Sequence, residues 1–512
     1  MTNKLYKYIS NMKNFVLNNK IVFFTVFVVG LLTHYLIYTD NVLSPDSLSA
    51  GLIHISGNGE MSLGRWGIAI FDFIRHGVVN NLLILLSCFV AISLSVLCLI
   101  KLFKVNKSSV KILLSAFIVS SPVFGEIFMF IYTADSYAYA FLLSIMTVCC
   151  LKSANVFLKR IGTIMCVIFS LSIYQAFIGV TLGLCVIYAV FQLLEKNSAK
   201  KVILNLMEDF FWIFIGMIFY MLLTKIILWA NGLNFTSRFG ADNFGIISII
   251  EGLISKCVIA YKTFFEFYFK DSIILNSLWN RDFLNFLIFL LIIIFGFVIV
   301  YKNAVYKKKM TLILLAFLLL IYPLTVNAIE LIIASNINLF MSSPLLLVYI
   351  VALICVEKIT KKESLLKYVI FLVIIAIIYV NIYSVNASYQ TRKQVFENYY
   401  ATAIQVSSDI KETVGYSSSD RYLFGGQIKF SAFMAPYSNG GTALYYETWG
   451  DVGDIWQNFQ FFRIYLGENY NMVSSEEANT ILNSKEYQNM PAYPDEGYIN
   501  KINGVNVIKL SK

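Results

Sequence analysis

The sequence predicts an all-α polytopic membrane protein that ends in a small α/β domain, and three observations support this fold class. Of its 512 residues, 58% are hydrophobic and only 14% are charged, whereas soluble domains carry about 25% charged residues. Apolar stretches of roughly 20 residues, the length that crosses a bilayer, recur as far as residue 386. Beyond that point Ser, Asn, Asp, Glu and Tyr become frequent. We therefore predict a transmembrane domain over residues 1–386 and a separate domain over residues 387–512.

About eleven of these apolar stretches are candidates for transmembrane helices. Each is expected to be helical, because in hydrocarbon only a helix pairs its backbone polar groups within the segment. The predicted spans are residues 21–39, 81–100, 112–132, 137–151, 161–174, 177–194, 210–229, 283–301, 311–328, 339–356 and 368–385.

Connections rich in Lys and Arg alternate along the chain with connections poor in them, and this alternation predicts the membrane topology. Cytoplasmic loops collect Lys and Arg, and residues 325–338 contain neither. An inside N-terminus and an odd number of spans place the C-terminal domain outside the plasma membrane. The net charge of +10 then belongs to a cytoplasmic collar that favours anionic lipid headgroups rather than nucleic acid. The basic connections are residues 1–20, 101–111, 152–160, 196–201, 302–309 and 358–367.

Several other features limit the class of protein. The first apolar stretch is longer than the ~7–15 residues of a signal-peptide core, and no A-x-A site follows it. All eight cysteines lie in or beside apolar segments, and the three histidines are scattered, so we predict no disulfide framework and no metal site. No cofactor is predicted, and a need for a divalent metal stays open. The frequent Ile, Lys, Asn and Tyr suggest a low-GC bacterium.

Two long segments lie outside the spans. Residues 230–282 contain an amphipathic core at 246–269, which predicts one or two helices lying at the membrane interface; a plain connector is the alternative. In residues 387–512, the segments 421–424 and 505–510 alternate like strands and lie near glycine-containing turns. This region is therefore expected to be a small mixed α/β domain.

Polar residues concentrate on the predicted outer face, in the connection over residues 40–80 and in the next two outer turns. Ionisable residues near a membrane are costly, so their positions carry information. Four to six helix ends would bring them together at one membrane depth, which predicts an outward-facing polar cavity. The candidate residues are Asp40, Asp46, Arg65, Glu126, Asp135, Tyr174 and Gln175.

Each candidate also has a structural explanation. Asp40 could be a solvated loop residue, and Asp46 a turn residue after Ser-Pro. Arg65 beside Trp66 could be an interfacial anchor pair, since both residue types favour that zone. Glu126 and Asp135 could cap or pair helix ends. Tyr174 and Gln175 could form hydrogen bonds with neighbouring helices.

Four short motifs resemble the GtrII-type glucosyltransferases, membrane enzymes that decorate bacterial O-antigen and related surface polysaccharides. They are Asp46 followed by Gly-Arg-Trp at 64–66, the acidic segment 126–137, Ile-Tyr-Gln-Ala at 173–176, and the C-terminal segment 490–497 followed by 507–510. Two positions depart from the family pattern. Pro45 stands before Asp46 where a second acid is common, and residues 338–344 lack the expected base. The second departure puts in doubt which residue binds the phosphate of the donor.

The resemblance implies a GT-C-type enzyme that transfers a sugar, such as glucose or another hexose, from a polyprenyl-phosphate donor to a surface polysaccharide or lipid-linked glycan. Asp46 would be the general base and Arg65 the phosphate ligand, while the other candidates would bind or orient the sugar. Asp135 is the competing base. As it is expected to open a helix, the helix dipole would stabilise its carboxylate and lower its basicity. Glu60 lies in a glycine turn and is set aside.

Two other classes of function remain as alternatives. A polysaccharide or lipid-linked sugar flippase would share the many helices, but transporter sites lie at the bilayer midplane between structural repeats. This sequence has few charges at the centres of its spans and no evident repeat. A non-catalytic scaffold would explain the helices but not the converging acids.

Overall fold

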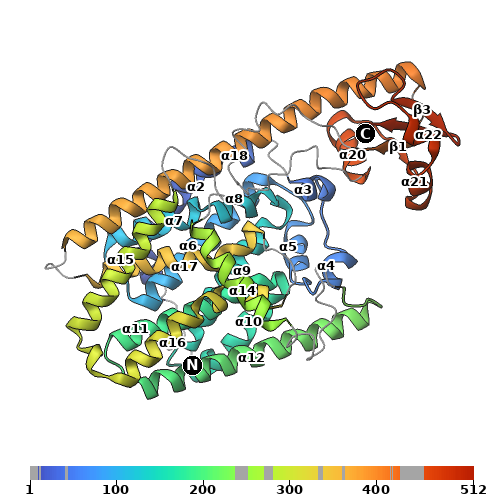
Figure 1. Ribbon diagram of the computed structural model, residues 1–512. Coiled ribbons are helices and arrows are strands. Elements are labelled where there is room, and N and C mark those ends of the chain that lie inside the picture. Colours follow the sequence, from blue (N-terminus) through green and yellow to red (C-terminus); the bar gives the residue numbers. More distant parts are fainter. Residues whose placement is uncertain are drawn as a thin grey trace.

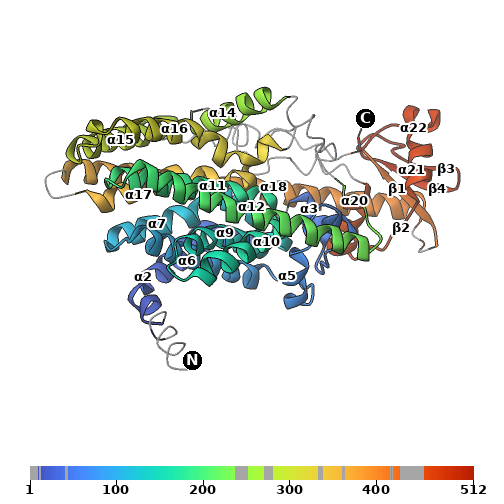
Figure 2. The same cartoon turned by 90° about the horizontal axis from the view of Figure 1, so that it is seen from below.

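The computed structural model describes residues 10, 13–40, 44–236, 252–269, 281–332, 338–359, 364–415, 417, 419–426 and 455–511. Over these residues the chain forms a long helical bundle with a small domain of strands and short helices at one end (Figure 1). Helix α18 (Ser364–Thr413) runs along the bundle and continues into this domain (Figure 2). The fold class, an all-α polytopic protein with a small sheet-containing domain, is confirmed.

The bundle is built almost entirely from helices of very different lengths. Its longer elements are α2 (Lys20–Thr39), α6 (Asn81–Phe103), α7 (Ser108–Ser120), α9 (Ile131–Leu151), α10 (Thr163–Ile173), α11 (Ile178–Leu194), α12 (Ala199–Ala230), α14 (Leu253–Phe269), α15 (Arg281–Lys302), α16 (Lys309–Val326), α17 (Leu347–Lys358) and α18. The short ones are α3 (Pro45–Ala50), α4 (Asn58–Ser62), α5 (Ile68–Arg75), α8 (Pro122–Met129), η1 (Leu158–Gly162), η2 (Gln175–Phe177), η4 (Val305–Lys307), η5 (Ala328–Leu331) and η6 (Leu339–Leu346).

In the described part of the chain, nine helical stretches are long and apolar enough to cross a membrane, and α7 with α8 would make a tenth. The eleven predicted stretches all form helix, but the fifth gives only the 11 residues of α10 after the short η1. Two local breaks shape this count. Ser121 is extended before Pro122, as the residue preceding a proline tends to be, and the chain bends by 42° there. Tyr174 is also extended, which ends α10 at Ile173.

The connections rich in Lys meet at the end of the bundle away from the small domain. Lys107 Nζ donates to the backbone oxygens of Val356 and Glu357, each at 2.8 Å. Lys358 Nζ lies 2.5 Å from Glu195 Oε1. The structure therefore gathers the connections at 101–111, 195–201 and 358–359 into one place, which we call the basic end.

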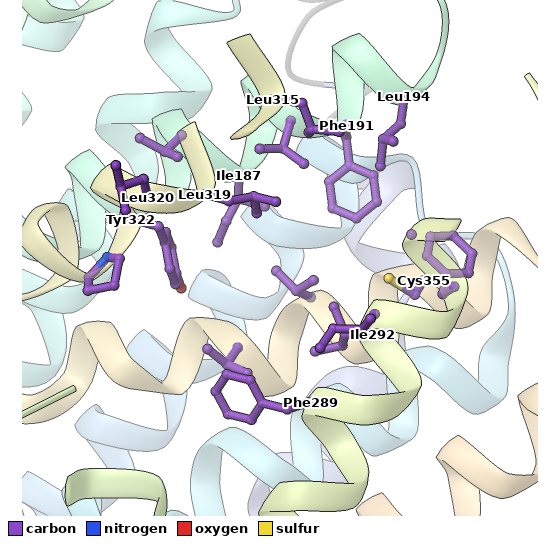
Figure 3. A pocket seen from close by; sticks show the side chains of 18 of the residues that line it. Ile187, Phe191, Leu194, Phe289, Ile292, Leu315, Leu319, Leu320, Tyr322 and Cys355 are labelled. Carbon is purple, nitrogen blue, oxygen red and sulfur yellow. The ribbon is translucent and has the colours of Figure 1, made fainter. Parts of the chain in front are cut away.

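The predicted amphipathic segment forms helix α14, which packs against α15 and α16. The flanking residues 237–251 and 270–280 lie outside the described residues. An interfacial position for α14 stays a prediction. Together with α11, α15, α16 and α17, this helix encloses a cavity of about 600 Å³ (Figure 3). Its lining is almost wholly apolar, including Phe191, Phe289, Ile292 and Leu319.

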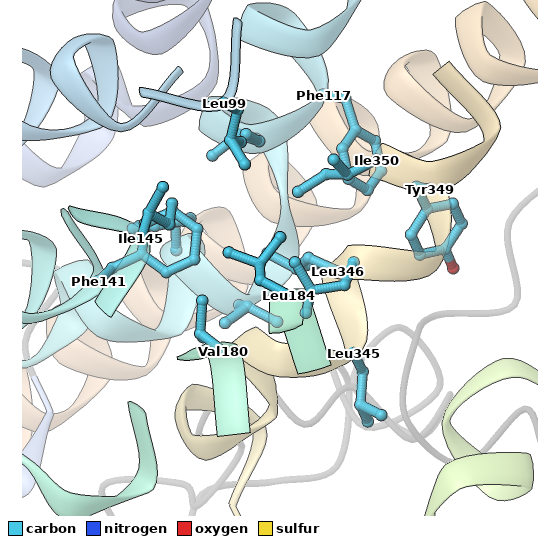
Figure 4. Close-up of a cluster of buried hydrophobic side chains, with 14 of the residues drawn as sticks. Leu99, Phe117, Phe141, Ile145, Val180, Leu184, Leu345, Leu346, Tyr349 and Ile350 are labelled. Carbon is cyan, nitrogen blue, oxygen red and sulfur yellow. The ribbon is translucent and has the colours of Figure 1, made fainter. Parts of the chain in front are cut away.

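The core of the bundle lies where α6, α7, α9, α11, η6 and α17 meet. Phe117 of α7 and Tyr349 of α17 face each other with ring centroids 4.7 Å apart, and Leu184 of α11 lies near Leu346 (Figure 4). Small residues permit the close approach, since a Cβ at Gly183 would lie 2.8 Å from Val326 Cγ1. The core is therefore held by interdigitated side chains, as expected in lipid, where apolar burial alone does not drive helices together.

The small domain contains a four-stranded sheet in the order β2-β1-β4-β3. Both segments predicted to be strands, 421–424 and 505–510, form its central strands. Strands β3 and β4 form a hairpin through Asn503-Gly504, both with positive φ, the conformation that a tight type I′ turn requires. The elements are β1 (Arg421–Gly425), α20 (Ile455–Phe461), η10 (Phe462–Leu466), β2 (Asn471–Met472), α21 (Ser475–Leu482), α22 (Lys485–Asn489), β3 (Ile499–Ile502) and β4 (Val505–Lys509).

Helix α18 joins the two parts without interruption. The bundle core includes Tyr389 of this helix, and the core of the small domain begins with Val395. The domain boundary that composition predicts after residue 386 falls within this helix. A continuous helix makes a stiff connection, so it limits how far the domain can turn relative to the bundle.

Candidate active site

A polar cavity of about 550 Å³ lies at the end of the bundle nearest the small domain. It differs from the apolar cavity of Figure 3 because carboxylates, an arginine, a histidine and tyrosine hydroxyls line it. Of these two cavities, it is the one whose lining can support ionic chemistry. The residues around it are Asp46, Ala50, His54, Gly59, Glu60, Leu63, Arg65, Ile68, Phe130, Tyr132, Thr133, Tyr137, Tyr174, Thr236, Asn338, Phe340 and Met341.

Asp46 lies in the first turn of the six-residue helix α3, and its side chain is exposed at the cavity. The helix begins where the sequence dictates. Ser44 caps it by accepting a hydrogen bond from the Ser47 amide at 3.1 Å, and Pro45 occupies the first turn. Ser47 Oγ also donates to the backbone oxygen of Met129 at 2.8 Å, which ties α3 to the end of α8.

Arg65 enters the same cavity from the turn between α4 and α5. Gly64, with φ of +76°, allows this turn, and the Arg65 amide donates to the backbone oxygen of Glu60 at 2.9 Å. The guanidinium lies 4.6 Å from the centre of the Tyr174 ring, a cation–π arrangement that fixes its plane. Its Nε is buried and has no hydrogen-bond partner among the described residues. A buried donor in this condition is suited to an oxygen of a bound ligand.

A second carboxylate in the cavity is Glu60, which sequence reasoning set aside as part of a flexible turn. Glu60 Oε2 instead accepts a hydrogen bond from the Gly57 amide at 2.9 Å, in the third position of helix α4. The other oxygen, Oε1, lies 3.8 Å from His54 Nε2. Gly57 has no side chain, so only the half of a capping box that Glu60 supplies is present; a Glu three residues after a turn glycine is the signal that could have indicated an ordered carboxylate.

Asp135 does not line the cavity, because it is paired with an arginine that sequence reasoning left out of the site. Arg75 Nη1 lies 3.2 Å from Asp135 Oδ1, and Arg75 Nη2 lies 2.5 Å from Asp72 Oδ1. The expectation that Asp135 opens a helix is also wrong, since α9 begins at Ile131 and places Asp135 in its second turn. Asp46 and Glu60, rather than Asp135, lie in the first turn of a helix, so the dipole argument does not favour Asp46 over Asp135 as the base.

Three further candidates do not line the cavity. Asp40 ends α2 and its Oδ1 is 2.8 Å from Lys393 Nζ, an ion pair that lowers the pKa of Asp40. Glu126 is buried within α8. Gln175 Nε2 donates to the Leu63 oxygen at 2.9 Å and so supports the turn that carries Arg65. Of the seven candidates, the structure brings Asp46, Arg65 and Tyr174 together on the cavity surface.

The comparison with known families decides the identity of the chain. A family profile described as Glucosyl transferase GtrII matches residues 31–349, more than half of the sequence. The chain belongs to this family. No curated protein and no solved structure gives a significant match to it. The matched part of this transferase contains every residue of the polar cavity, which is therefore the candidate active site.

Proposed function

We propose that this transferase moves a sugar, glucose or another hexose, from a polyprenyl-phosphate donor to a cell-surface polysaccharide on the non-cytoplasmic face of the membrane. The observation that carries the proposal is that Asp46 and Arg65 line the same cavity, which brings a carboxylate together with a guanidinium whose Nε has no partner in the described part of the chain. Glycosyl transfer from a phosphate donor requires a base and a cation for the leaving group.

In the proposed reaction, Asp46 accepts the proton of the acceptor hydroxyl as its oxygen attacks the anomeric carbon. The bond between this carbon and the phosphate oxygen breaks, and polyprenyl phosphate leaves with the negative charge. Arg65 holds the phosphate oxygens, and the ring of Tyr174 keeps the guanidinium in place. Glu60, the second carboxylate of the cavity, is available to bind sugar hydroxyls.

The basic end supports the outward orientation that this proposal requires. Connections rich in Lys favour the cytoplasm, so we propose that the cavity at the opposite end of the bundle faces outward. Nucleotide sugars are cytoplasmic, and a lipid-linked sugar is the donor class available on the other face. Membership of a glucosyltransferase family favours this function over a flippase, which would share the helices but not the transfer chemistry.

The test supplies purified transferase with labelled polyprenyl-phosphate glucose or with labelled UDP-glucose, together with cell-envelope polysaccharide from a deletion strain. Label should reach the polysaccharide only from the lipid-linked donor, and linkage analysis should show the sugar branch missing in the deletion strain. Efficient transfer from UDP-glucose without a lipid carrier would overturn the donor assignment. An unchanged polysaccharide in the deletion strain would overturn the acceptor class.

A further inference from the structure

We propose that the C-terminal domain is a positioning element of the active site, which holds helix α3, and with it Asp46, through the side chain of Leu48. This inference rests on the proposed function, because it assumes that the position of Asp46 matters for transfer. It assigns a role to a domain that lies outside the part of the chain matched by the family profile.

Helix α3 cannot hold its own position. It has six residues, whereas isolated helices shorter than ~12–15 residues are marginal in water. Its placement must come from tertiary contacts, and it has these on two sides. On the bundle side, the Ser44 amide and Ser47 Oγ both donate to the Met129 oxygen, at 3.2 and 2.8 Å.

On the other side, Leu48 is buried in the core of the C-terminal domain. Only 1% of its surface is exposed, and it belongs to the cluster that includes Tyr399 of α18 and Phe461 of α20. Helices α3 and α20 lie side by side in both views (Figures 1 and 2). No other residue before α18 in the described chain belongs to this cluster, so Leu48 is a direct link from the candidate active site to the domain core.

Because α3 is helical, fixing Leu48 also fixes the direction in which the Asp46 side chain points. Residues i and i+2 of a helix lie roughly 200° apart around its axis and do not face the same side. When Leu48 is seated in the domain, Asp46 must therefore face away from it, and the cavity lies on that side. A rotation of α3 about its axis would unseat Leu48 and move the carboxylate together.

The domain itself has a fixed position from which to hold α3. Helix α18 is anchored to the bundle by Tyr389, whose hydroxyl lies 2.9 Å from His34 Nδ1, and by the Lys393–Asp40 ion pair. The domain is thus attached at α18 and again at α3. Two separated attachments restrict the orientation of the domain further than helix α18 does alone.

The test replaces Leu48 by Ala and measures turnover and donor affinity separately in the full-length transferase. A shift of about 1 Å at a reacting group can cost roughly 10²-fold in rate. Leu48→Ala should therefore lower kcat at least tenfold while the Kd for polyprenyl-phosphate glucose changes less than about threefold, because Arg65 and Tyr174 remain in place. Leu48→Met preserves volume and should restore most of the turnover.

The matched control is Leu52→Ala. Leu52 lies two residues beyond the end of α3 and is 66% exposed, so its loss should leave kcat at the parent value. Should Leu48→Ala fail to accumulate, Ile464→Ala decides, since Ile464 packs beside Gly51 from the domain side. A lowered kcat with unchanged donor affinity supports the proposal, and parental kcat in the folded Leu48 or Ile464 variant overturns it. An inactive parent would instead contradict the proposed function.

Discussion

Replacing Asp46 by Asn removes the proposed base with almost no change in size. The exposed position of Asp46 limits the structural cost, because a carboxylate in the first turn of a helix stabilises it by about 0.3–1 kcal/mol. The catalytic cost should be far larger, since a positioned general base typically contributes ~10²–10⁴-fold. At about 1.4 kcal/mol for each factor of ten, this corresponds to roughly 3–5 kcal/mol of barrier.

Asp135→Asn is the matched control, because it removes a different carboxylate, one that already forms an ion pair with Arg75. Its partner Arg75 keeps Asp72 at 2.5 Å and the Tyr132 oxygen at 2.8 Å, so the guanidinium is not left bare. The loss should cost stability on the order of 1–3 kcal/mol, the range for a broken buried polar contact. Turnover of the folded variant should stay within about tenfold of the parent.

The assay compares initial rates of transfer from polyprenyl-phosphate glucose with thermal unfolding and donor binding of the same detergent-purified samples. Asp46→Asn should lose at least 100-fold in rate while its unfolding temperature and donor binding stay near those of the parent. The reasoning fails if Asp46→Asn retains more than about a tenth of the parent rate. Glu60→Gln then identifies whether the other cavity carboxylate is the base.

Arg65→Lys keeps the charge but loses the planar fork, so donor affinity should fall on the order of tenfold with the fold intact; unchanged affinity would favour the interfacial-anchor reading. Gly67→Ala should destabilise the transferase by about 1–3 kcal/mol in thermal unfolding, because its Cβ would lie 3.0 Å from the backbone carbon and oxygen of Ser172. Gly59→Ala, where nothing lies within 4 Å, should not. Thr480 is exposed on α21, and a cysteine placed there should react with an impermeant thiol reagent in intact cells whose wall admits the reagent. Labelling only after lysis would contradict the prediction that the C-terminal domain lies outside the membrane.

The sequence alone determined the membrane class, the approximate helix pattern and the strands of the C-terminal domain. These properties depend on local composition: an apolar stretch must be helical in lipid wherever it lies, and an alternating segment bounded by turns forms a strand in many contexts. It also predicted a polar cavity and three of the residues on its surface, Asp46, Arg65 and Tyr174. Composition did not determine the number of spans, because the bend before Pro122 and the break at Tyr174 divide apolar sequence without changing its composition.

Only the tertiary structure decided which polar groups are paired with other side chains and which line the cavity. Asp135 and Arg75 are 60 residues apart in the chain, and no local pattern shows that they form an ion pair. Glu60 is ordered by a cap at Gly57 and lies near His54, so it belongs to the cavity although its sequence resembles a loose turn. Leu48 shares one hydrophobic cluster with Tyr399 and Phe461, which lie more than 300 residues further along the chain. Such contacts depend on how distant surfaces fit together, and that fit is a property of the whole packed chain rather than of any segment.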